Sequence, residues 1–433
     1  MKTFFIRHSW LLFVFLSVLA LVGPMSSGFS KVLCVLCVPT FMVMYKEELR
    51  ALYRERTAER YYLYGILFFC LYVFVQVVVW SFLPDKYGYK PTYGAIEEFL
   101  FAYLLLSLMA WVMGVGLTQK MFERIMVSFG LCTVLGGVFL LWAYLDMSLL
   151  WKSPSAFFSN VLQCRFLDCG SEKFPSMTIF LKDYSFYPTF GSLLLIPLAI
   201  KREGVKRWLL ILLSILNACF LVFTINRGTM LGFGVALVLM AVYFTRKLAW
   251  RKKMLAVLCI AAAMALVVAV LPQSIKVRFV EMVSESNAFF KEGHDSGSAS
   301  IRLTIWKTLL SHTKEFWLFG EGPLYGTNRL RAYLSEAGYQ HYIDCGYIYH
   351  NQYLAYFHHY GIIGLLFLPF LLFYPLYAMW RNRCFSVTLA SIIIVFAIAL
   401  MEDRYLGKAA VAALLFILYF SFFQVDKWRF LET

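Results

Sequence analysis

Long apolar runs, separated by short polar connections, extend along most of the chain. Many of these runs approach the ~20 residues that an α-helix needs to cross the hydrocarbon core of a bilayer. We count twelve candidate spans, of which 32–45 is the weakest: 10–26, 32–45, 62–83, 99–118, 126–145, 186–200, 208–224, 228–245, 254–271, 361–380, 386–401 and 409–424. The pattern predicts an all-α fold, a polytopic transmembrane helical bundle of about twelve spans.

Composition supports a membrane protein. Of the 433 residues, 61% are hydrophobic and only 15% are charged, and the mean hydropathy is +0.70. Soluble domains carry about 25% charged residues. The composition therefore excludes a cytosolic globular enzyme and a disordered chain.

The charge balance is best explained by orientation in a membrane. The chain has 40 Lys and Arg against 25 Asp and Glu, a formal charge of +15. In a soluble protein this excess would suggest nucleic acid, but the cytoplasmic loops of membrane proteins collect Lys and Arg. With the N-terminus inside, more than half of the Lys and Arg fall in loops on one side. We therefore predict that both termini are cytoplasmic. An uncleaved first span fits a polytopic chain better than a signal peptide does.

This orientation divides the chain into three parts. Residues 1–271 would hold the first nine spans, with a smaller outer loop at 146–183. Residues 272–350 would form one large outer loop that contains amphipathic helices, and 351–433 would hold the last three spans.

A short polar turn, Thr224-Ile225-Asn226-Arg227-Gly228, joins two apolar runs with almost no loop. It places Arg227 at the outer boundary of the membrane, where a charge is costly unless it reaches water or an anion. A planar guanidinium suits phosphate oxygens, and Gly228 permits a tight turn or the close approach of a ligand. The alternative interpretation is an interfacial arginine that contacts lipid headgroups.

The segment 298–310 has apolar residues at helical spacing, and Ser298 or Ser300 suits its N-cap. The apolar positions are Ile301, Ile305, Trp306, Leu309 and Leu310. Arg302 lies near the start of this helix, where the macrodipole disfavours a cation. An anion bound there would contact both Arg302 and free backbone N–H groups. A solvated arginine is the alternative.

The segment 347–364 is typical of an aromatic amphipathic helix that enters the tenth span. Helical spacing places on one face His350, Leu354, Phe357 and Gly361. We therefore expect His350 near the same membrane plane as Arg227. A neutral imidazole there can accept a proton, whereas an ordinary interfacial side chain is the alternative.

Three further features carry weaker signals. Gly320, Gly322 and Gly326 mark a loop that needs small residues, and it lacks the sequence of a nucleotide-binding loop. We interpret the His358-His359 pair as interfacial. The sequence contains no H-x-x-x-H motif with a third acidic ligand, so it does not predict a zinc site. The outer turn Glu402-Asp403-Arg404 is a weaker candidate for substrate contact.

Taken in order, these motifs resemble the O-antigen ligase and O-antigen polymerase superfamily of bacterial envelope enzymes. The resemblance runs from about Thr224 to Leu365. Its most specific part is His350-Asn351, followed after nine residues by Gly361-Ile362-Ile363-Gly364. The family's usual Ser before Arg-Gly is Asn226 here, a departure that leaves Arg227 in place.

The resemblance implies transfer of a glycan from undecaprenyl diphosphate at the periplasmic face of the bacterial inner membrane. It implies neither a metal nor another cofactor, nor a nucleic-acid partner, and membrane lipids surround both substrates. His350 would be the catalytic residue, and Arg227 and Arg302 would bind the diphosphate. The residues that we expect in support are Asn226, Gly228, Asn351, Gly361, Gly320 and Gly322.

The chemistry of the residues agrees with these roles. An acceptor sugar hydroxyl needs a base as it attacks, and a positioned histidine contributes roughly 10²–10⁴-fold. The departing lipid diphosphate gains negative charge, which guanidinium groups at a semi-dry interface stabilise. We therefore expect His350, Arg227 and Arg302 to converge in one cavity open to the outer leaflet.

The single dominant outer loop favours a ligase that uses lipid A–core as acceptor. The alternative within the superfamily is a polymerase that extends the lipid-linked glycan. A transporter would show two related halves with charges at mid-membrane, which the sequence does not show. A non-catalytic scaffold is a third interpretation.

Overall fold

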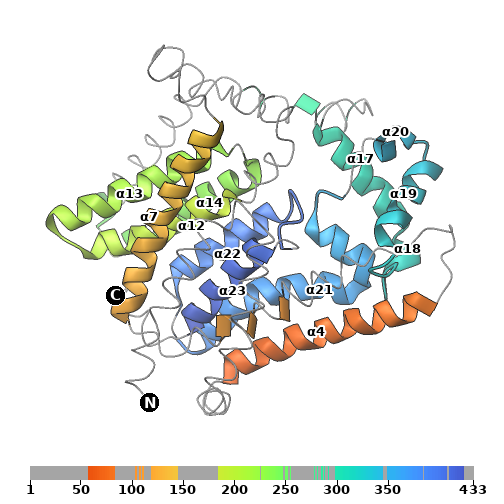
Figure 1. The fold of residues 1–433 in the computed structure, drawn as a ribbon, viewed down its shortest axis with the longest axis horizontal. Coiled ribbons are helices and arrows are strands. Elements are labelled where there is room, and N and C mark those ends of the chain that lie inside the picture. The colour runs from red at the N-terminus through yellow and green to blue at the C-terminus, as the bar shows by residue number, and fades with distance from the viewer. Residues whose placement is uncertain are drawn as a thin grey trace.

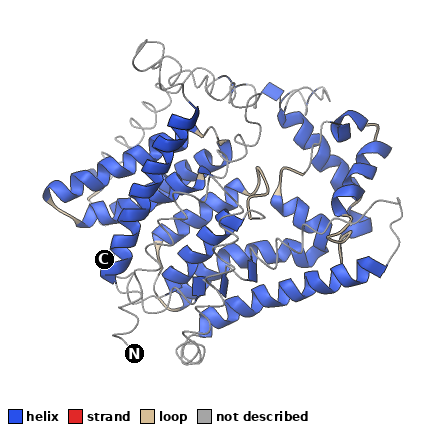
Figure 2. Ribbon diagram, in the orientation of Figure 1, coloured by secondary structure: helices blue, strands red, loops and turns tan. Residues whose placement is uncertain are grey.

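The computed structural model describes residues 57–82, 119–144, 184–224, 226–246, 298–344, 349–383, 385–406 and 409–423, with isolated positions between 103 and 111 and between 249 and 291. Within these residues the regular structure is helical, with no strand (Figure 2). The all-α prediction is confirmed.

Most of the predicted spans are helices. Those that coincide with predicted runs are α4 (Thr57–Phe82), α7 (Gln119–Tyr144), α12 (Phe186–Lys201), α13 (Gly204–Phe223), α14 (Arg227–Thr245), α21 (Gln352–Arg381), α22 (Val387–Ala399) and α23 (Ala409–Phe423). Five of the described helices are long and apolar enough to cross a membrane, namely α4, α7, α13, α14 and α21. The runs 10–26, 32–45 and 254–271, and most of 99–118, lie outside the described residues, so the total of twelve stays a prediction.

The outer faces of these helices are apolar, as a lipid environment requires. On α4, Phe68, Phe74 and Phe82 are exposed, whereas Tyr62 and Phe69 on the opposite face are fully buried. In water such a surface would favour association, but hydrocarbon solvates it at no cost. The protein is therefore built as a membrane protein.

Helices α22 and α23 lie near the centre of the molecule, and two groups of helices lie on either side of them (Figure 1). On one side lie α7, α12, α13 and α14, and α22 packs between α12 and α14. Phe186 of α12 stacks on Phe396 of α22 with ring centroids 5.0 Å apart. At the α14–α22 crossing, a Cβ on Gly232 would lie 2.8 Å from the Cα of Val395, so glycine is needed for this close approach.

On the other side, α4 runs beside α21 (Figure 1). Phe69 of α4 stacks on Phe367 of α21 with centroids 3.8 Å apart, and the Tyr62 hydroxyl donates to the carbonyl of Leu371 at 2.9 Å. The two helices are thus joined by aromatic packing, with the polar hydroxyl satisfied inside an apolar environment.

A small unit of short helices lies beyond α21: α17 (Ser298–Ser311), α18 (Thr313–Phe316), α19 (Gly326–Glu336) and α20 (Gln340–Asp344). It has a core of its own, formed among others by Ile305, Leu309 and Phe316. The predicted helix from Ser298 is confirmed, although Leu310 is half exposed rather than in its core face.

Helix α21 is broken at Gly361, whose φ of 63° and ψ of −152° are almost exclusive to glycine. The break frees carbonyls that a glycine-rich loop then binds. The backbone N–H groups of Glu321 and Gly322 donate to the carbonyls of His358 and His359 at 2.8 and 3.1 Å. In return, Ile362 donates to the carbonyl of Trp317 at 2.8 Å.

The loop needs small residues, as the sequence predicted. The reason is the close packing of its backbone against the break in α21. Gly320 has a φ of 78°, and a Cβ there would contact the carbonyl of His359. Gly322 has a φ of 80° and lies against the ring of Trp80. The glycines let two pieces of backbone pair face to face at the helix break.

The predicted continuous helix over 347–364 is wrong in two respects. The helix begins only at Gln352, capped by Asn351, so His350 precedes it. Gly361 then ends its first segment, so His350 and Gly361 do not share one helix face. Local capping by Asn351 and the backbone conformation of Gly361 override the apolar periodicity.

We predict that Gly361→Ala destabilises the protein. A side chain in this backbone region costs on the order of 1–3 kcal/mol, and the new Cβ would contact the carbonyl of Leu318. The control is Gly234→Ala in α14, because no described atom lies within 4 Å of the Cβ it would carry. Thermal unfolding of the purified protein in detergent measures both. Equal midpoints for the two variants would contradict the structural role of Gly361.

Candidate functional site

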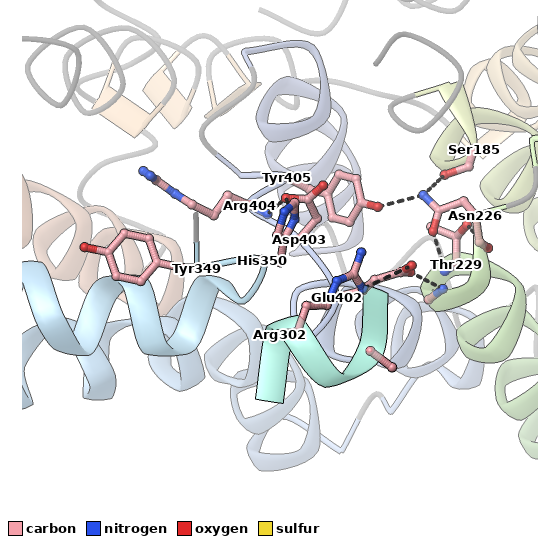
Figure 3. Close-up of polar contacts among 12 residues, drawn as sticks. Ser185, Asn226, Thr229, Arg302, Tyr349, His350, Glu402, Asp403, Arg404 and Tyr405 are labelled. Carbon is pink, nitrogen blue, oxygen red and sulfur yellow. Dashed lines mark hydrogen bonds and ion pairs between the residues drawn. The ribbon is translucent and has the colours of Figure 1, made fainter. Parts of the chain in front are cut away.

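One turn organises the polar groups on the side where α14, α17 and α21 begin. It follows α22, spans Leu400–Leu406, and carries Glu402, Asp403 and Arg404. Figure 3 shows His350 and Asp403 beside each other, with Arg302 and Glu402 next to them. We refer to residues 400–406 as the acidic turn.

His350 faces Asp403 of the acidic turn. Its Nδ1 lies 3.7 Å from Oδ1 of Asp403, and both side chains are about one-fifth exposed. This separation is too long for a hydrogen bond, but it places a carboxylate directly beside the imidazole ring. The same Oδ1 of Asp403 accepts from the backbone N–H of Arg404 at 2.8 Å.

The backbone at His350 is strained and is held in place from the side of α21. His350 has a φ of 43°, a conformation that costs a non-glycine residue on the order of 1–3 kcal/mol. Asn351 next to it accepts from the N–H of Leu354 at 3.1 Å. The backbone N–H of Gln352 donates to the carbonyl of Leu400, and the side-chain Oε1 of Gln352 accepts from the N–H of Leu406. Both ends of the acidic turn are thus bound to the residue that begins α21.

Arg302 faces the other carboxylate of the turn. Its NH1 lies 3.8 Å from Oε1 of Glu402, and both side chains are about one-quarter exposed or less. At the start of the same helix, the N–H of Ala299 donates to Oε2 of Glu285 at 2.9 Å. The sequence indicated that an anion at this end of the helix would contact both Arg302 and backbone N–H groups. In the structure, two carboxylates of the chain itself make these contacts.

The start of α14 is the third element at the acidic turn. Asn226 caps α14 by accepting from the N–H of Thr229 at 3.2 Å. Its amide donates to Oγ of Ser185 at 2.9 Å and to the hydroxyl of Tyr405 at 2.8 Å (Figure 3). One asparagine thereby joins α12, α14 and the acidic turn, which serine at this position would not do.

The side chain of Glu402 also accepts a hydrogen bond from the backbone N–H of Gly228. A Cβ on Gly228 would lie 2.5 Å from Oε2 of Glu402 and 3.2 Å from the Cα of Ala399, so glycine is required for this approach. Arg227, which precedes it, is the first residue of α14 and is partly buried. Glu402 thus connects the start of α14 to Arg302.

The predicted site residues therefore fall into two groups. The segments that carry Asn226, Arg227, Gly228, Arg302, His350 and Asn351 all meet the acidic turn. The second group, Gly320, Gly322 and Gly361, lies at the break in α21, about 15 Å away along the helix at 1.5 Å per residue. These three glycines support the half-helix that follows His350 and do not line its surroundings.

The acidic turn contributes more to the site than its sequence indicated, and the prediction for two histidines is wrong. Glu402 and Asp403 contact Arg302 and His350, although the sequence signal was only a charged turn at the end of a span. His358 and His359 are buried rather than interfacial. The unit of short helices α17–α20 covers them, which the sequence alone does not reveal.

A buried polar network lies behind His350. The hydroxyl of Tyr349 lies 2.7 Å from Nδ1 of His358 and 2.9 Å from Nε2 of His359. Burial, more than any neighbouring charge, raises the pKa of the Tyr349 hydroxyl well above its ordinary value. The phenol therefore stays protonated and acts as a fixed hydrogen-bonding group.

A second part of this network belongs to the unit of short helices. The Tyr333 hydroxyl donates to Oε1 of Glu321 at 2.8 Å, and Nε of Arg329 lies 3.4 Å from Oε2 of the same carboxylate. Burial, followed by the charge of Glu321, raises the pKa of Tyr333. The carboxylate of Glu321 is thus neutralised by Arg329 inside the unit, beside the loop that binds the break in α21.

The arrangement at the acidic turn combines two chemical capacities. An imidazole beside a carboxylate can accept a proton and keep it. Arginine side chains beside the N-terminal amides of a helix can stabilise negative oxygens. Such a site suits a reaction in which a hydroxyl loses a proton while an anionic group departs.

Comparison with known proteins agrees with the motifs. A protein-family model described as O-antigen ligase matches residues 212–369. The match includes Arg227, Arg302 and His350 and ends before the acidic turn. A search among curated proteins found no match for the chain.

We predict that Asn226→Ala lowers the stability of the protein more than Asn226→Ser does. Loss of an N-cap costs roughly 0.5–2 kcal/mol, and alanine also removes the amide that reaches Ser185 and Tyr405. Serine keeps a cap acceptor and loses only that amide. Thermal unfolding in detergent, followed by tryptophan fluorescence, gives the order of midpoints. An alanine variant as stable as wild type would show that the cap contributes nothing.

Proposed function

We propose that the chain, whose residues 212–369 match the family model described as O-antigen ligase, is the ligase that joins O-antigen to lipid A–core. The donor is a polysaccharide on undecaprenyl diphosphate, and the acceptor is a sugar hydroxyl of lipid A–core. The product is lipopolysaccharide. The observation that carries the proposal is the meeting of His350, Arg302 and the start of α14 at the acidic turn.

In the proposed reaction, His350 is the general base. It accepts the proton of the acceptor hydroxyl as the hydroxyl oxygen attacks the anomeric carbon, which contributes roughly 10²–10⁴-fold. Asp403, 3.7 Å from Nδ1, stabilises the imidazolium that forms and keeps the ring oriented. Asp403 is therefore a positioning residue, because it acts on the reaction through His350.

The leaving group is undecaprenyl diphosphate, which takes the electron pair of the broken bond between the anomeric carbon and the phosphate oxygen. Arg227 and Arg302 bind its oxygens, since the guanidinium fork matches phosphate geometry. The N–H of Gly228 adds a backbone donor at the start of α14. The carboxylate of Glu402, which contacts Gly228 and Arg302, marks where negative oxygens are stabilised in this site.

The remaining residues of the site support these groups. Asn226 and Asn351 cap the two helices that begin there. Gly361, Gly320 and Gly322 hold the half-helix that follows His350. The proposed chemistry needs neither a metal nor another cofactor, because protein side chains supply both the base and the positive charges.

The arrangement of charged helix ends supports a periplasmic site. Helices α12, α13, α14, α21 and α22 all have one end at the acidic turn. Their opposite ends carry basic residues, at 201–207, 246–253 and 381–383. Basic loops are typically cytoplasmic. We therefore propose a bacterial inner-membrane protein with its site in the periplasm and both termini in the cytoplasm.

Reconstitution tests the proposed function. The purified protein is mixed with undecaprenyl-diphosphate glycan and lipid A–core in vesicles, without ATP or metal. Glycan attached to lipid A–core is the expected product. Longer lipid-linked glycans with no lipid A–core product would instead identify a polymerase. Substrate flipping without any transfer would refute the enzyme and indicate a transporter.

We predict that His350→Ala abolishes transfer and that Asp403→Asn lowers kcat by about 10–100-fold, because the base is lost in one and its carboxylate partner in the other. The control is His341→Ala, an exposed histidine on α20. Initial rates in the reconstituted assay measure all three. Equal rates for wild type and His350→Ala would remove the histidine from the mechanism.

We predict that Arg227→Lys and Arg302→Lys each retain a trace of activity, whereas the alanine variants retain none. Lysine keeps the positive charge but loses the planar fork. The control is Arg331→Lys, a partly exposed residue on α19. Donor KM and kcat are measured for each variant. Unchanged kinetics in both lysine variants would contradict diphosphate binding by these arginines.

A further inference from the structure

Tyr349, the residue before His350, is held by contacts of both its side-chain hydroxyl and its backbone carbonyl. It is fully buried, and its ring is perpendicular or tilted to the rings of His359 and His358. Its hydroxyl contacts both imidazoles, and its carbonyl accepts from Nε1 of Trp306 at 2.7 Å.

The hydroxyl of Tyr349 matches the two imidazoles chemically. A phenol has one hydrogen to donate and oxygen lone pairs that accept. It can therefore donate to one ring nitrogen and accept from an N–H of the other ring. The two histidines are adjacent in sequence, so they leave the helix in directions about 100° apart, and one hydroxyl contacts one ring nitrogen of each.

The carbonyl of Tyr349 connects His350 to the helix that carries Arg302. Trp306 lies one turn after Arg302 on α17, and its indole N–H reaches the carbonyl of Tyr349. On the other side of His350, Gln352 is bound to the carbonyl of Leu400 and to the N–H of Leu406. The left-handed backbone of His350 is thus determined by fixed residues before and after it.

We infer that Tyr349 and Trp306 are positioning residues that hold His350 in its strained conformation and at a fixed distance from Arg302. The inference rests on the proposed function. The base and the diphosphate-binding arginine come from segments almost fifty residues apart, so their separation is set by a contact between the segments. The Trp306–Tyr349 hydrogen bond is that contact, and the hydroxyl–imidazole contacts keep Tyr349 from rotating away.

The first test is Tyr349→Phe, which removes the hydroxyl and keeps the ring. We expect kcat to fall roughly 10–100-fold, as a small displacement of a reacting group does, with the donor Kd and the binding stoichiometry unchanged. Kd is measured directly with undecaprenyl-diphosphate glycan. The control is Tyr339→Phe, a partly exposed tyrosine of the same unit that stacks on Tyr342. A kcat within twofold of wild type would overturn the inference.

The second test is Trp306→Phe, alone and combined with Tyr349→Phe. If both residues act through the position of His350, the double variant is no slower than the slower single variant. Fold-losses that multiply would show independent effects and overturn the coupling. A loss of binding stoichiometry together with kcat would show a merely structural role. If Tyr349→Phe does not fold, Trp306→Phe still decides the matter, because a kcat equal to that of wild type refutes it.

The same assay separates this inference from the proposed function. A wild-type protein that transfers no glycan to any acceptor contradicts the proposed function. A wild-type protein that transfers glycan while both phenylalanine variants match its kcat contradicts only the positioning role. Transfer by wild type, with kcat lost and donor binding kept in Tyr349→Phe, supports both.

Discussion

The site depends on the hydrogen bonds between Gln352 and the acidic turn. Gln352 is fully buried, and it binds the first residue of the turn through its N–H and the last residue through its side chain. These two bonds hold the turn against the start of α21, while Asn226 and Gly228 hold it against α14. Between these attachments Asp403 faces His350 and Glu402 faces Arg302.

The broken helix explains how the unit of short helices is attached to the long helices. A continuous α21 would satisfy its own carbonyls and could not offer them to the unit of short helices. The break at Gly361 offers the carbonyls of His358 and His359 to the loop that contains Gly320 and Gly322. Unsatisfied backbone groups are costly in a low-dielectric environment, so this exchange attaches the unit firmly to the membrane-spanning helices.

Charge at the site is balanced by the chain itself. His350 and Arg302 each lie close to a carboxylate of the acidic turn, at 3.7 Å and 3.8 Å. Both contacts are longer than a hydrogen bond, so they place opposite charge nearby without fixing the side chains in tight bonds. In the proposed function, an anionic substrate exchanges for the carboxylate beside Arg302.

The sequence by itself determined the helical class, the positions of most spans and the motifs that contain Arg227, Arg302 and His350. Apolar runs of span length and short polar turns are local patterns, so they are readable without a fold. Only the tertiary structure decided that Asp403 and Glu402 face His350 and Arg302, that His358 and His359 are buried, and that Gly361 breaks its helix. These features arise from contacts between segments far apart in the chain, and periodicity carries no information about which polar groups such contacts bring together.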